Sequence, residues 1–253
     1  MFMFDTECVL DLKTDRIIFP FTKEYLDYQD WITNNPNEYS KLVHKGRDEA
    51  SWQGLLEDGT IVKKLYQHDY TLWVESEVRL LPNQNYQTHG IQKTYHKDGW
   101  VELTETFRNG LKHGEHKTYD HEGGVTTEGE YKQDNKIGDW FYYFYNQKQI
   151  QVHERYYDNG KVNTRKEFSQ QSKLIRDFSY DDKGRLHGQY RDSHNNGELR
   201  ARGTMKSGKM NGLWVFYYID GSQEYEIKFD NGKPVDRLVY YGMDGKVKWE
   251  KNT

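Results

Sequence analysis

Short runs of aromatic and β-branched residues, separated by Asp-Gly or Asn-Gly pairs, recur along this chain. In the clearest case, residues 214–218 and 225–229 are rich in such side chains. Asp220-Gly221 separates these two runs, and Asn231-Gly232 closes the second. Such pairs tolerate the positive φ angles of a tight turn, and aromatic side chains suit a pleated, half-buried surface. The pattern over Gly212 to Gly232 therefore predicts a β-hairpin with a turn at each end.

This hairpin is one unit of a regular repeat. Equivalent glycines follow one another at intervals of 24, 24, 50 and 24, and a degenerate unit near Asn163 divides the interval of 50 into 25 and 25. Asp236 continues the series one further interval of 24 along. The glycines are Gly90, Gly114, Gly138, Gly188 and Gly212. The sequence thus has a period of about 24 residues, and we expect roughly seven units in residues 86–253.

Aromatic residues recur two and five positions after these glycines, and the fifth position is the more faithful. It holds Tyr95, Tyr119, Tyr143, Phe168, Ser193, Tyr217 and Tyr241. A single hairpin is unstable alone in water, so neighbouring hairpins must stack. Each aligned cross-strand pair adds about 0.2–1 kcal/mol. The repeats thus predict an all-β protein, an elongated and twisted antiparallel sheet of stacked β-hairpins.

Residues 1–85 lack the repeat, and we expect them to form a small α+β cap on the open end of the sheet. Residues 16–21 read as a strand and residues 22–31 as a brief helix. A second helix is predicted from Asn35, as N-cap, to Gly46, since Pro36 and Glu38 follow the cap. Further strands are predicted within 55–66, with a turn at Asp58-Gly59, and over 71–81. The expected organisation is a cap over 1–85 and repeats over 86–253.

The composition agrees with a thin structure. Only 34% of the residues are hydrophobic, yet 15% are aromatic, including 21 tyrosines. The chain is therefore too aromatic to be disordered and too poor in Leu, Ile and Val for a thick core. Its one cysteine, Cys8, is expected to be a reduced structural thiol. Residues 1–10 lack the basic and apolar regions of a signal peptide, and we expect a cytoplasmic protein.

The charge balance argues against binding to nucleic acid. The chain has 36 basic and 40 acidic residues, which gives a formal net charge of −4. Nucleic-acid binding depends on neutralising phosphates with Lys and Arg, so this function is not expected. A net negative chain also argues mildly against docking on acidic membranes.

No residues in the sequence form a recognisable catalytic, cofactor or metal motif. His113 and His116 are three residues apart, and in a strand such residues point to opposite faces, so the pair is not expected to chelate a metal. No nucleophile elbow, phosphate loop or zinc-binding helix motif is present, and we expect neither enzyme activity nor a cofactor. The acidic residues of the second strands are expected to be solvated surface charges. They are Glu102, Glu128, Glu154 and Glu226.

The sequence motif of the repeats resembles that of the MORN-repeat variant. It is carried by Asn-Gly-Leu-Lys-His-Gly at 109–114, Gly-Asp-Trp-Phe-Tyr-Tyr at 138–143, Lys-Gly-Arg-Leu-His-Gly at 183–188 and Asn-Gly-Leu-Trp-Val-Phe-Tyr-Tyr at 211–218. This variant makes up the YwqK family of bacterial antitoxins, and the resemblance covers about two-thirds of the chain. The unit over 161–184 departs from it, since the glycine that begins each unit and the glycine of the turn are missing there.

The resemblance implies a binding protein. The leading expectation is an antitoxin or immunity protein that neutralises a cognate bacterial toxin by direct occlusion, without turnover. MORN repeats also serve as assembly scaffolds and have been proposed to bind acidic phospholipids. A scaffold that docks on acidic membranes or assembles protein complexes is therefore the alternative.

Two strands are predicted to carry aromatic residues on both faces, over 140–145 and 214–218. The aromatic residues on one face are expected to pack against those at equivalent positions of the neighbouring hairpins. The other face, carrying Phe141, Phe216 and Tyr145, is a candidate partner surface, because aromatic residues concentrate in interface hot spots. Burial beneath the N-terminal segment explains it equally well. The candidate partner-binding residues are Phe141, Tyr145, Phe216, Tyr218, Trp140 and Trp214.

Overall fold

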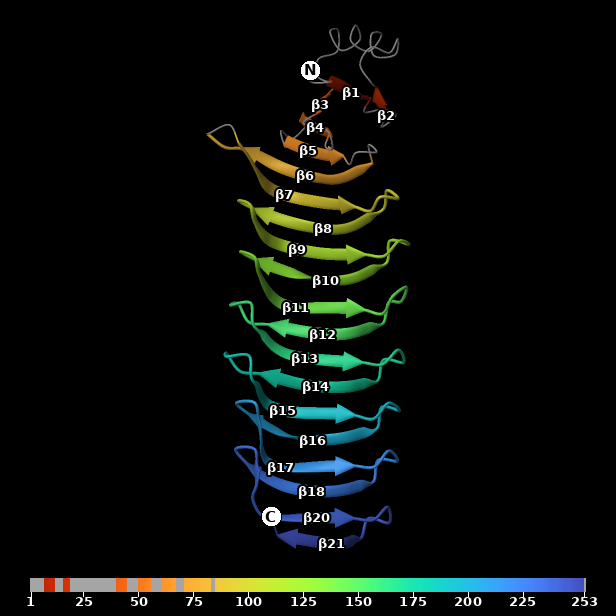
Figure 1. The fold of residues 1–253 in the computed structure, drawn as a ribbon, viewed down its shortest axis with the longest axis vertical. Coiled ribbons are helices and arrows are strands. Elements are labelled where there is room, and N and C mark those ends of the chain that lie inside the picture. Colours follow the sequence, from red (N-terminus) through yellow and green to blue (C-terminus); the bar gives the residue numbers. More distant parts are fainter. Residues whose placement is uncertain are drawn as a thin grey trace, which may run out of the picture. The chain divides into compact units, whose positions relative to one another are not determined.

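The chain is all-β, and antiparallel hairpins follow one another along the sequence (Figure 1). The computed structural model describes residues 7–11, 16–18, 40–44, 50–55, 61–66, 71–82 and 85–252. It contains two compact units, Met1–Gly123 and Gly124–Thr253. The predicted all-β repeat architecture is confirmed, and no helix is present among the described residues.

The first unit is an antiparallel meander in which each strand from β3 onward pairs with the next. β1 pairs with both β2 and β3 and so joins the start of the chain to the same sheet. The strands are β1 (Glu7–Asp11), β2 (Arg16–Ile18), β3 (Ser40–His44), β4 (Ala50–Leu55), β5 (Ile61–Tyr66), β6 (Leu72–Leu80), β7 (Tyr86–Tyr95), β8 (Val101–Arg108) and β9 (Leu111–Tyr119). The sheet passes through residue 85 without a break, because β6 pairs with β7.

The predicted elements of the N-terminal region are only partly correct. The strands predicted over 16–21, 55–66 and 71–81 correspond to β2, the β4–β5 hairpin and β6. The helix predicted from Asn35 to Gly46 is wrong over Ser40–His44, which is β3. Pairing of β3 with both β1 and β4 outweighs the local capping signal, as tertiary context often does. The helix predicted over 22–31 lies outside the described residues.

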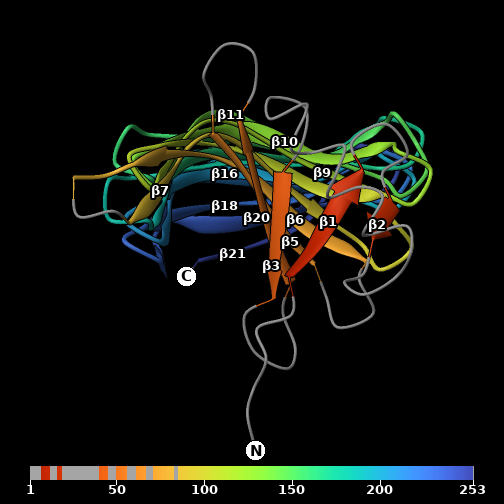
Figure 2. The same ribbon diagram turned by 90° about the horizontal axis from the view of Figure 1, so that it is seen from above.

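The second unit is also an open antiparallel sheet. Its strands pair in sequence order, and β18 pairs with both β19 and β20. The strands are β10 (Val125–Lys132), β11 (Asn135–Tyr143), β12 (Ile150–Tyr156), β13 (Val162–Phe168), β14 (Leu174–Tyr180), β15 (Leu186–Ser193), β16 (Leu199–Lys206), β17 (Lys209–Tyr217), β18 (Gln223–Asp230), β19 (Lys233–Pro234), β20 (Arg237–Tyr241) and β21 (Val247–Asn252). Seen from above, the strands curve and bring their turns to two opposite sides (Figure 2).

The turns use the residues that the sequence pattern indicates. Asn231 and Gly232 both have positive φ, 49° and 83°, as a two-residue hairpin turn requires. Gly221 has φ 85° and closes the turn between β17 and β18 by donating its N–H to the carbonyl of Tyr218. In the degenerate unit, Ser172 takes the place of this glycine and adopts φ 58°. The turn geometry is therefore kept where the glycine is lost.

The repeat columns predicted from the sequence have a structural counterpart. Every residue of the fifth-position column is the last residue of the first strand of its hairpin, from Tyr95 at the end of β7 to Tyr241 at the end of β20. Successive turns on this side are tied together. Asn196 Nδ2 donates to the carbonyl of Ile219 at 2.9 Å, and Lys173 Nζ donates to the carbonyl of Asn196 at 2.8 Å.

A single-layer sheet buries few apolar side chains. Only Trp140 and Trp214 are large side chains buried almost completely among the described residues. The inner packing of the second unit is therefore organised around two tryptophans.

No helix in the described part of the chain is long and apolar enough to cross a membrane.

Candidate functional site

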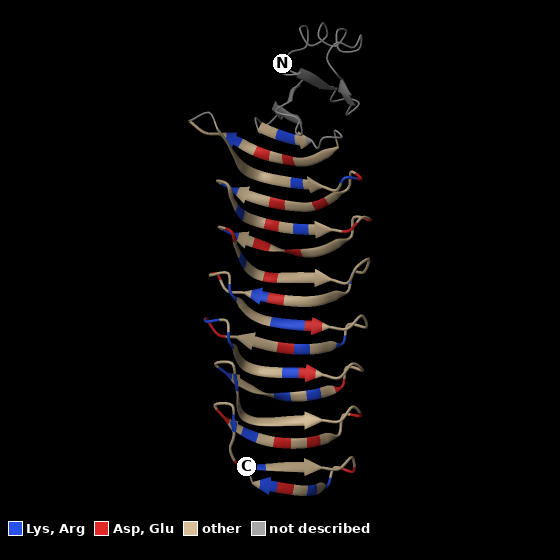
Figure 3. Cartoon of the chain, in the orientation of Figure 1, with Lys and Arg blue, Asp and Glu red and all other residues tan. Residues whose placement is uncertain are grey.

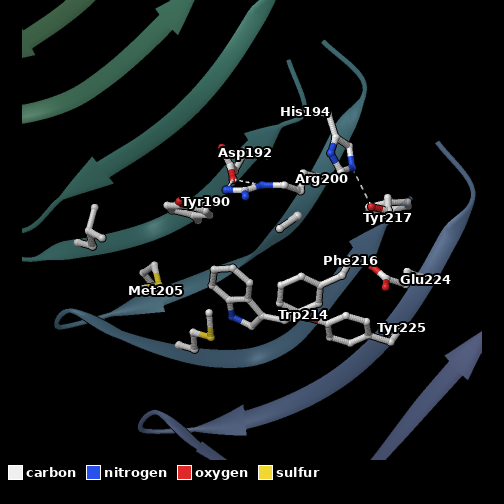
Figure 4. A pocket seen from close by; sticks show the side chains of 13 residues that line it. Tyr190, Asp192, His194, Arg200, Met205, Trp214, Phe216, Tyr217, Glu224 and Tyr225 are labelled. Atoms are coloured by element: carbon white, nitrogen blue, oxygen red, sulfur yellow. Dashed lines mark hydrogen bonds and ion pairs between the residues drawn. The ribbon is translucent and has the colours of Figure 1, made fainter. Parts of the chain in front are cut away.

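An open groove lies on one face of the second unit, between β15 and β18. Its volume is about 520 Å³, and its walls come from four successive strands. Figure 4 shows its aromatic side chains on the inner side of the bend in these strands. We call this surface the inner face and the opposite surface the outer face. The floor of the groove consists of Tyr190, Met205, Met210, Trp214, Phe216 and Tyr225.

Trp214 forms the base of this floor because it packs on Gly203 of the neighbouring strand. A Cβ atom at Gly203 would lie 2.3 Å from Cδ2 of Trp214, so only glycine admits the indole ring here. The register between β16 and β17 shifts at this point, and Gly212 adopts φ 74°. The resulting bulge turns the indole onto β16. Its Nε1 donates a 3.1 Å hydrogen bond to the carbonyl of Thr204.

The same arrangement occurs earlier in the unit, at Trp140. A Cβ atom at Gly129 would lie 2.2 Å from Cδ2 of Trp140, and Trp140 Nε1 donates a 3.2 Å hydrogen bond to the carbonyl of Glu130. Each tryptophan is 1% exposed. In both cases the glycine precedes the tryptophan by 11 residues. This signal is visible in the sequence, but the repeat analysis missed it.

The aromatic rings of the floor form a continuous stack. Phe216 lies between Trp214 and Tyr225, with ring centroids 6.1 Å and 4.3 Å away. Tyr190 adds a further ring, 5.4 Å from Trp214. Such pairs each contribute about 0.5–1.5 kcal/mol beyond the area they bury. The floor is therefore a rigid apolar surface.

An ionic ladder runs along the inner face beside the aromatic floor. Each of the strands β12 to β15 carries both acidic and basic residues, whereas β17 is almost free of charged residues (Figure 3). The ladder consists of Glu154, Arg165, Glu167, Arg176, Asp192 and Arg200.

Asp192 is the buried carboxylate at the groove end of this ladder. Its side chain is 3% exposed, and it accepts hydrogen bonds from Arg200 Nε at 2.6 Å and Arg176 Nε at 3.4 Å. Nη1 of Arg176 also binds Glu167 at 2.9 Å. A buried charge is tolerated only when it is paired and hydrogen-bonded. Two guanidinium groups meet that requirement for Asp192.

Glu154 at the other end of the ladder corrects a sequence prediction. It is 6% exposed, so the prediction that it is a solvated surface charge is wrong. Tyr156 and Tyr142 donate their hydroxyl protons to it over 2.7 Å and 3.1 Å, and Arg165 binds its other oxygen. Burial would raise the pKa of Glu154, but these hydrogen bonds outweigh burial and hold the pKa below its ordinary value. Cross-strand partners that are distant in sequence make this burial possible.

The predicted partner surface does not form one face. Phe216 shares the inner face with Trp214, whereas Phe141 directly follows Trp140 in β11 and points to the outer face. There Phe141 stacks on His153, with ring centroids 4.7 Å apart. The prediction that Phe141 and Phe216 lie on a common face is therefore wrong. They stand three and four positions after their glycines, and one position reverses the face of a strand residue.

The other candidate residues are distributed over three environments. Trp140 and Trp214 support the sheet from within and present almost no surface to a partner. Tyr145 is 63% exposed, in the turn between β11 and β12. The Tyr218 hydroxyl lies 2.6 Å from that of Tyr240. This hydrogen bond, together with burial, raises the pKa of Tyr218 to about 12.

In the first unit, His116 is part of a polar cluster. Its Nδ1 lies 2.9 Å from Oε1 of Glu105, and Lys112 Nζ lies 2.6 Å from the same oxygen. Burial would raise the pKa of Glu105, but the hydrogen bonds to His116 and Lys112 lower it below its ordinary value. No group of three or more His, Cys, Asp and Glu side chains in the described part of the chain is arranged to hold a metal ion.

Comparison with known proteins found no match to this chain, either among protein-family profiles or among curated proteins. The resemblance of the repeats to the MORN variant stays a prediction.

Proposed function

We propose that this chain is a non-catalytic binding protein that holds a protein partner on the inner face of β15–β18. The observation that supports this proposal most directly is the open groove with its stacked aromatic floor. Protein interfaces concentrate their binding energy in such aromatic clusters, which are preorganised and lose little entropy on binding. Phe216 and Tyr225 are the side chains that offer this surface.

The partner that we propose is a cognate bacterial toxin, with the chain acting as its antitoxin or immunity protein. The sequence motif of the repeats supports this choice, because it resembles that of the YwqK antitoxins. The mechanism is steric, because a partner seated in the groove is occluded while no bond is made or broken. The chain itself supplies aromatic contacts and orientation by the charges at the groove.

The inner face suits a protein better than an acidic membrane. Arg165 and Arg176 are each paired with two carboxylates of the ladder. Binding of anionic headgroups depends on basic side chains that gain by neutralising phosphates. Guanidinium groups already held between two carboxylates gain little in this way, whereas the apolar floor gains free energy when a partner covers its surface.

Co-expression with the protein encoded by the adjacent gene tests this proposal. We expect that protein to arrest growth alone, growth to resume when this chain is co-expressed, and the two to purify as one complex. Continued arrest with no complex would contradict the antitoxin function. Flotation with vesicles of anionic phospholipid is the matched measurement for the scaffold alternative, and we expect the chain to remain unbound.

A further inference from the structure

Two charges of opposite sign stand at equivalent positions on the rim of the groove. Arg200 lies near the start of β16 and Glu224 near the start of β18, so that one repeat of the sequence separates them. Both line the groove, beside Phe216 and Tyr225 (Figure 4). Strands are about 4.8 Å apart, so positions one hairpin apart are separated by about 10 Å.

Both rim charges retain capacity to bind a partner. Arg200 is 55% exposed in its side chain, and it uses Nε and Nη2 to bind Asp192. Among the described residues, neither its Nη1 nor the Glu224 carboxylate makes a hydrogen bond. A charged side chain of a partner therefore finds an acceptor at Glu224 and a donor at Arg200.

Comparison with the Trp140 cluster indicates which kind of side chain the floor between these charges can bind. There Lys136 Nζ lies 4.0 Å from the Trp140 ring and 2.8 Å from the Tyr142 hydroxyl, close to the cluster that holds Glu154. The equivalent cluster around Trp214 has Met210 in place of Lys136 and Phe216 in place of Tyr142.

The carboxylate is replaced as well. Glu154 is the cross-strand neighbour of Trp140, whereas the neighbour of Trp214 is Ile227. The ammonium group of Lys136, the hydroxyl of Tyr142 and the carboxylate of Glu154 thus have apolar counterparts around Trp214. The floor of the groove consequently favours an apolar side chain over a cation.

We propose that the groove recognises an extended protein segment with an acidic and a basic side chain four residues apart and an apolar side chain midway between them. Side chains at every second residue of an extended chain point to the same face, and with a rise of about 3.3 Å per residue four residues span about 13 Å. The long side chains of Arg200 and Glu224 can reach across the difference from the separation of about 10 Å. The acidic side chain binds Arg200, the basic one binds Glu224, and the apolar one packs on Phe216 and Tyr225. This inference rests on the proposed function, since it names the feature of the partner that the groove selects.

A random dodecapeptide library displayed on phage, selected on the full chain, tests this inference without knowledge of the toxin. We expect the selected peptides to be enriched in the acid–apolar–base pattern. With Glu224→Lys, both rim charges are positive, and the selected pattern is expected to change to two acidic side chains. Peptides of the original pattern should then bind roughly threefold to tenfold more weakly, as expected for partly exposed charge pairs.

A second variant tests the floor. Met210→Lys places an ammonium group where Lys136 stands over Trp140, and we expect recovery of the selected peptides to fall at least tenfold. Lys209→Met, at the neighbouring exposed position, is the matched control and should leave recovery unchanged. Near-ultraviolet circular dichroism of each variant confirms that the aromatic stack is intact.

The inference is overturned if selection yields no enriched peptides, if the pattern lacks charges, or if Glu224→Lys leaves the pattern unchanged. These results are independent of the toxin experiment. Enrichment of the expected pattern without protection in co-expression contradicts the antitoxin function alone. Protection by both the native chain and Glu224→Lys, with an unchanged peptide pattern, contradicts the groove specificity alone.

Discussion

At the scale of single residues, two glycines set how closely the tryptophans approach the sheet. Gly203→Ala would place a Cβ atom 2.3 Å from the Trp214 ring, so the ring or the strand must move. We expect a loss of about 2 kcal/mol in the free energy of unfolding, as for other overpacked sites. Urea unfolding followed by tryptophan fluorescence measures this loss.

The control for this substitution lies in the same strand. Lys206→Ala removes an exposed side chain at the end of β16 and should change the free energy of unfolding by less than about 0.5 kcal/mol. Equal stability of Gly203→Ala and Lys206→Ala would show that the Trp214 ring does not depend on this close approach.

The sequence predicts some glycines and misses others for a physical reason. Gly221 and Gly232 are predictable because a turn is local, and its positive φ depends on adjacent residues. Gly129 and Gly203 are strand residues without positive φ. Their role depends on an indole from the neighbouring strand, and only the register of the bulged pair reveals that contact.

At the scale of elements, the ionic ladder predicts a pH dependence. The pKa of Glu154 is below 4.5 in the folded chain, because hydrogen bonds from Tyr156, Arg165 and Tyr142 outweigh burial. Glu154 therefore stabilises the fold above about pH 4.5, and this contribution is lost as the pH falls through the lowered pKa. We expect Glu154→Gln to cost about 2 kcal/mol at pH 7 and much less at pH 3.

Urea unfolding of the native chain and Glu154→Gln between pH 3 and pH 7 measures this change. Glu198→Gln, at an exposed position after the turn between β15 and β16, is the matched control and should show a small and constant difference. A difference for Glu154→Gln that stays constant across this range would contradict the role assigned to the ladder.

A second element-scale prediction concerns the link from β17 to β20. The Tyr218 hydroxyl lies 2.6 Å from the Tyr240 hydroxyl and 3.2 Å from the carbonyl oxygen of Tyr241. Tyr218→Phe should cost about 1 kcal/mol, the usual value of a net hydrogen bond. Amide hydrogen exchange is expected to quicken in Arg237–Tyr241 and to remain unchanged in β12. Uniform acceleration in both strands would show instead that the hydroxyl acts on the unit as a whole.

The contacts of the ionic ladder could not be predicted from the sequence, because they join residues that are far apart along the chain. Glu154 and Arg165 are 11 residues apart, and Arg176 and Asp192 are 16 apart. They meet because β12 to β15 pair in a definite register. The repeat period predicted the hairpins. It could not predict which face of the sheet each residue points to, because that depends on the positions of β-bulges.

At the scale of the whole molecule, each unit is a row of hairpins in which every hairpin contacts its neighbours. Stability in such arrays is close to a sum of hairpin and nearest-neighbour contributions. Repeats can therefore replace polar residues by apolar ones at one place without loss of the fold. The change from the Trp140 cluster to the Trp214 cluster illustrates this freedom, and the Trp214 cluster lines the groove on β15–β18.

The faces of the candidate partner-binding residues could be predicted only in part from the sequence. The aromatic runs correctly predicted that residues 140–143 and 214–217 lie in strands, β11 and β17. The choice of a common face for Phe141 and Phe216 failed because one position of offset reverses a strand residue. The same offset makes these two phenylalanines a matched pair, one on each face of the second unit.

Binding through the inner face is tested most directly by the dissociation constant of the complex with the protein encoded by the adjacent gene. It is measured for the native chain, Phe216→Ala and Phe141→Ala, after thermal unfolding has confirmed that each variant is folded. We expect Phe216→Ala to weaken binding at least tenfold, or about 1.4 kcal/mol, and Phe141→Ala to change it less than threefold. Weaker binding of Phe141→Ala together with native binding of Phe216→Ala would contradict the inner-face site.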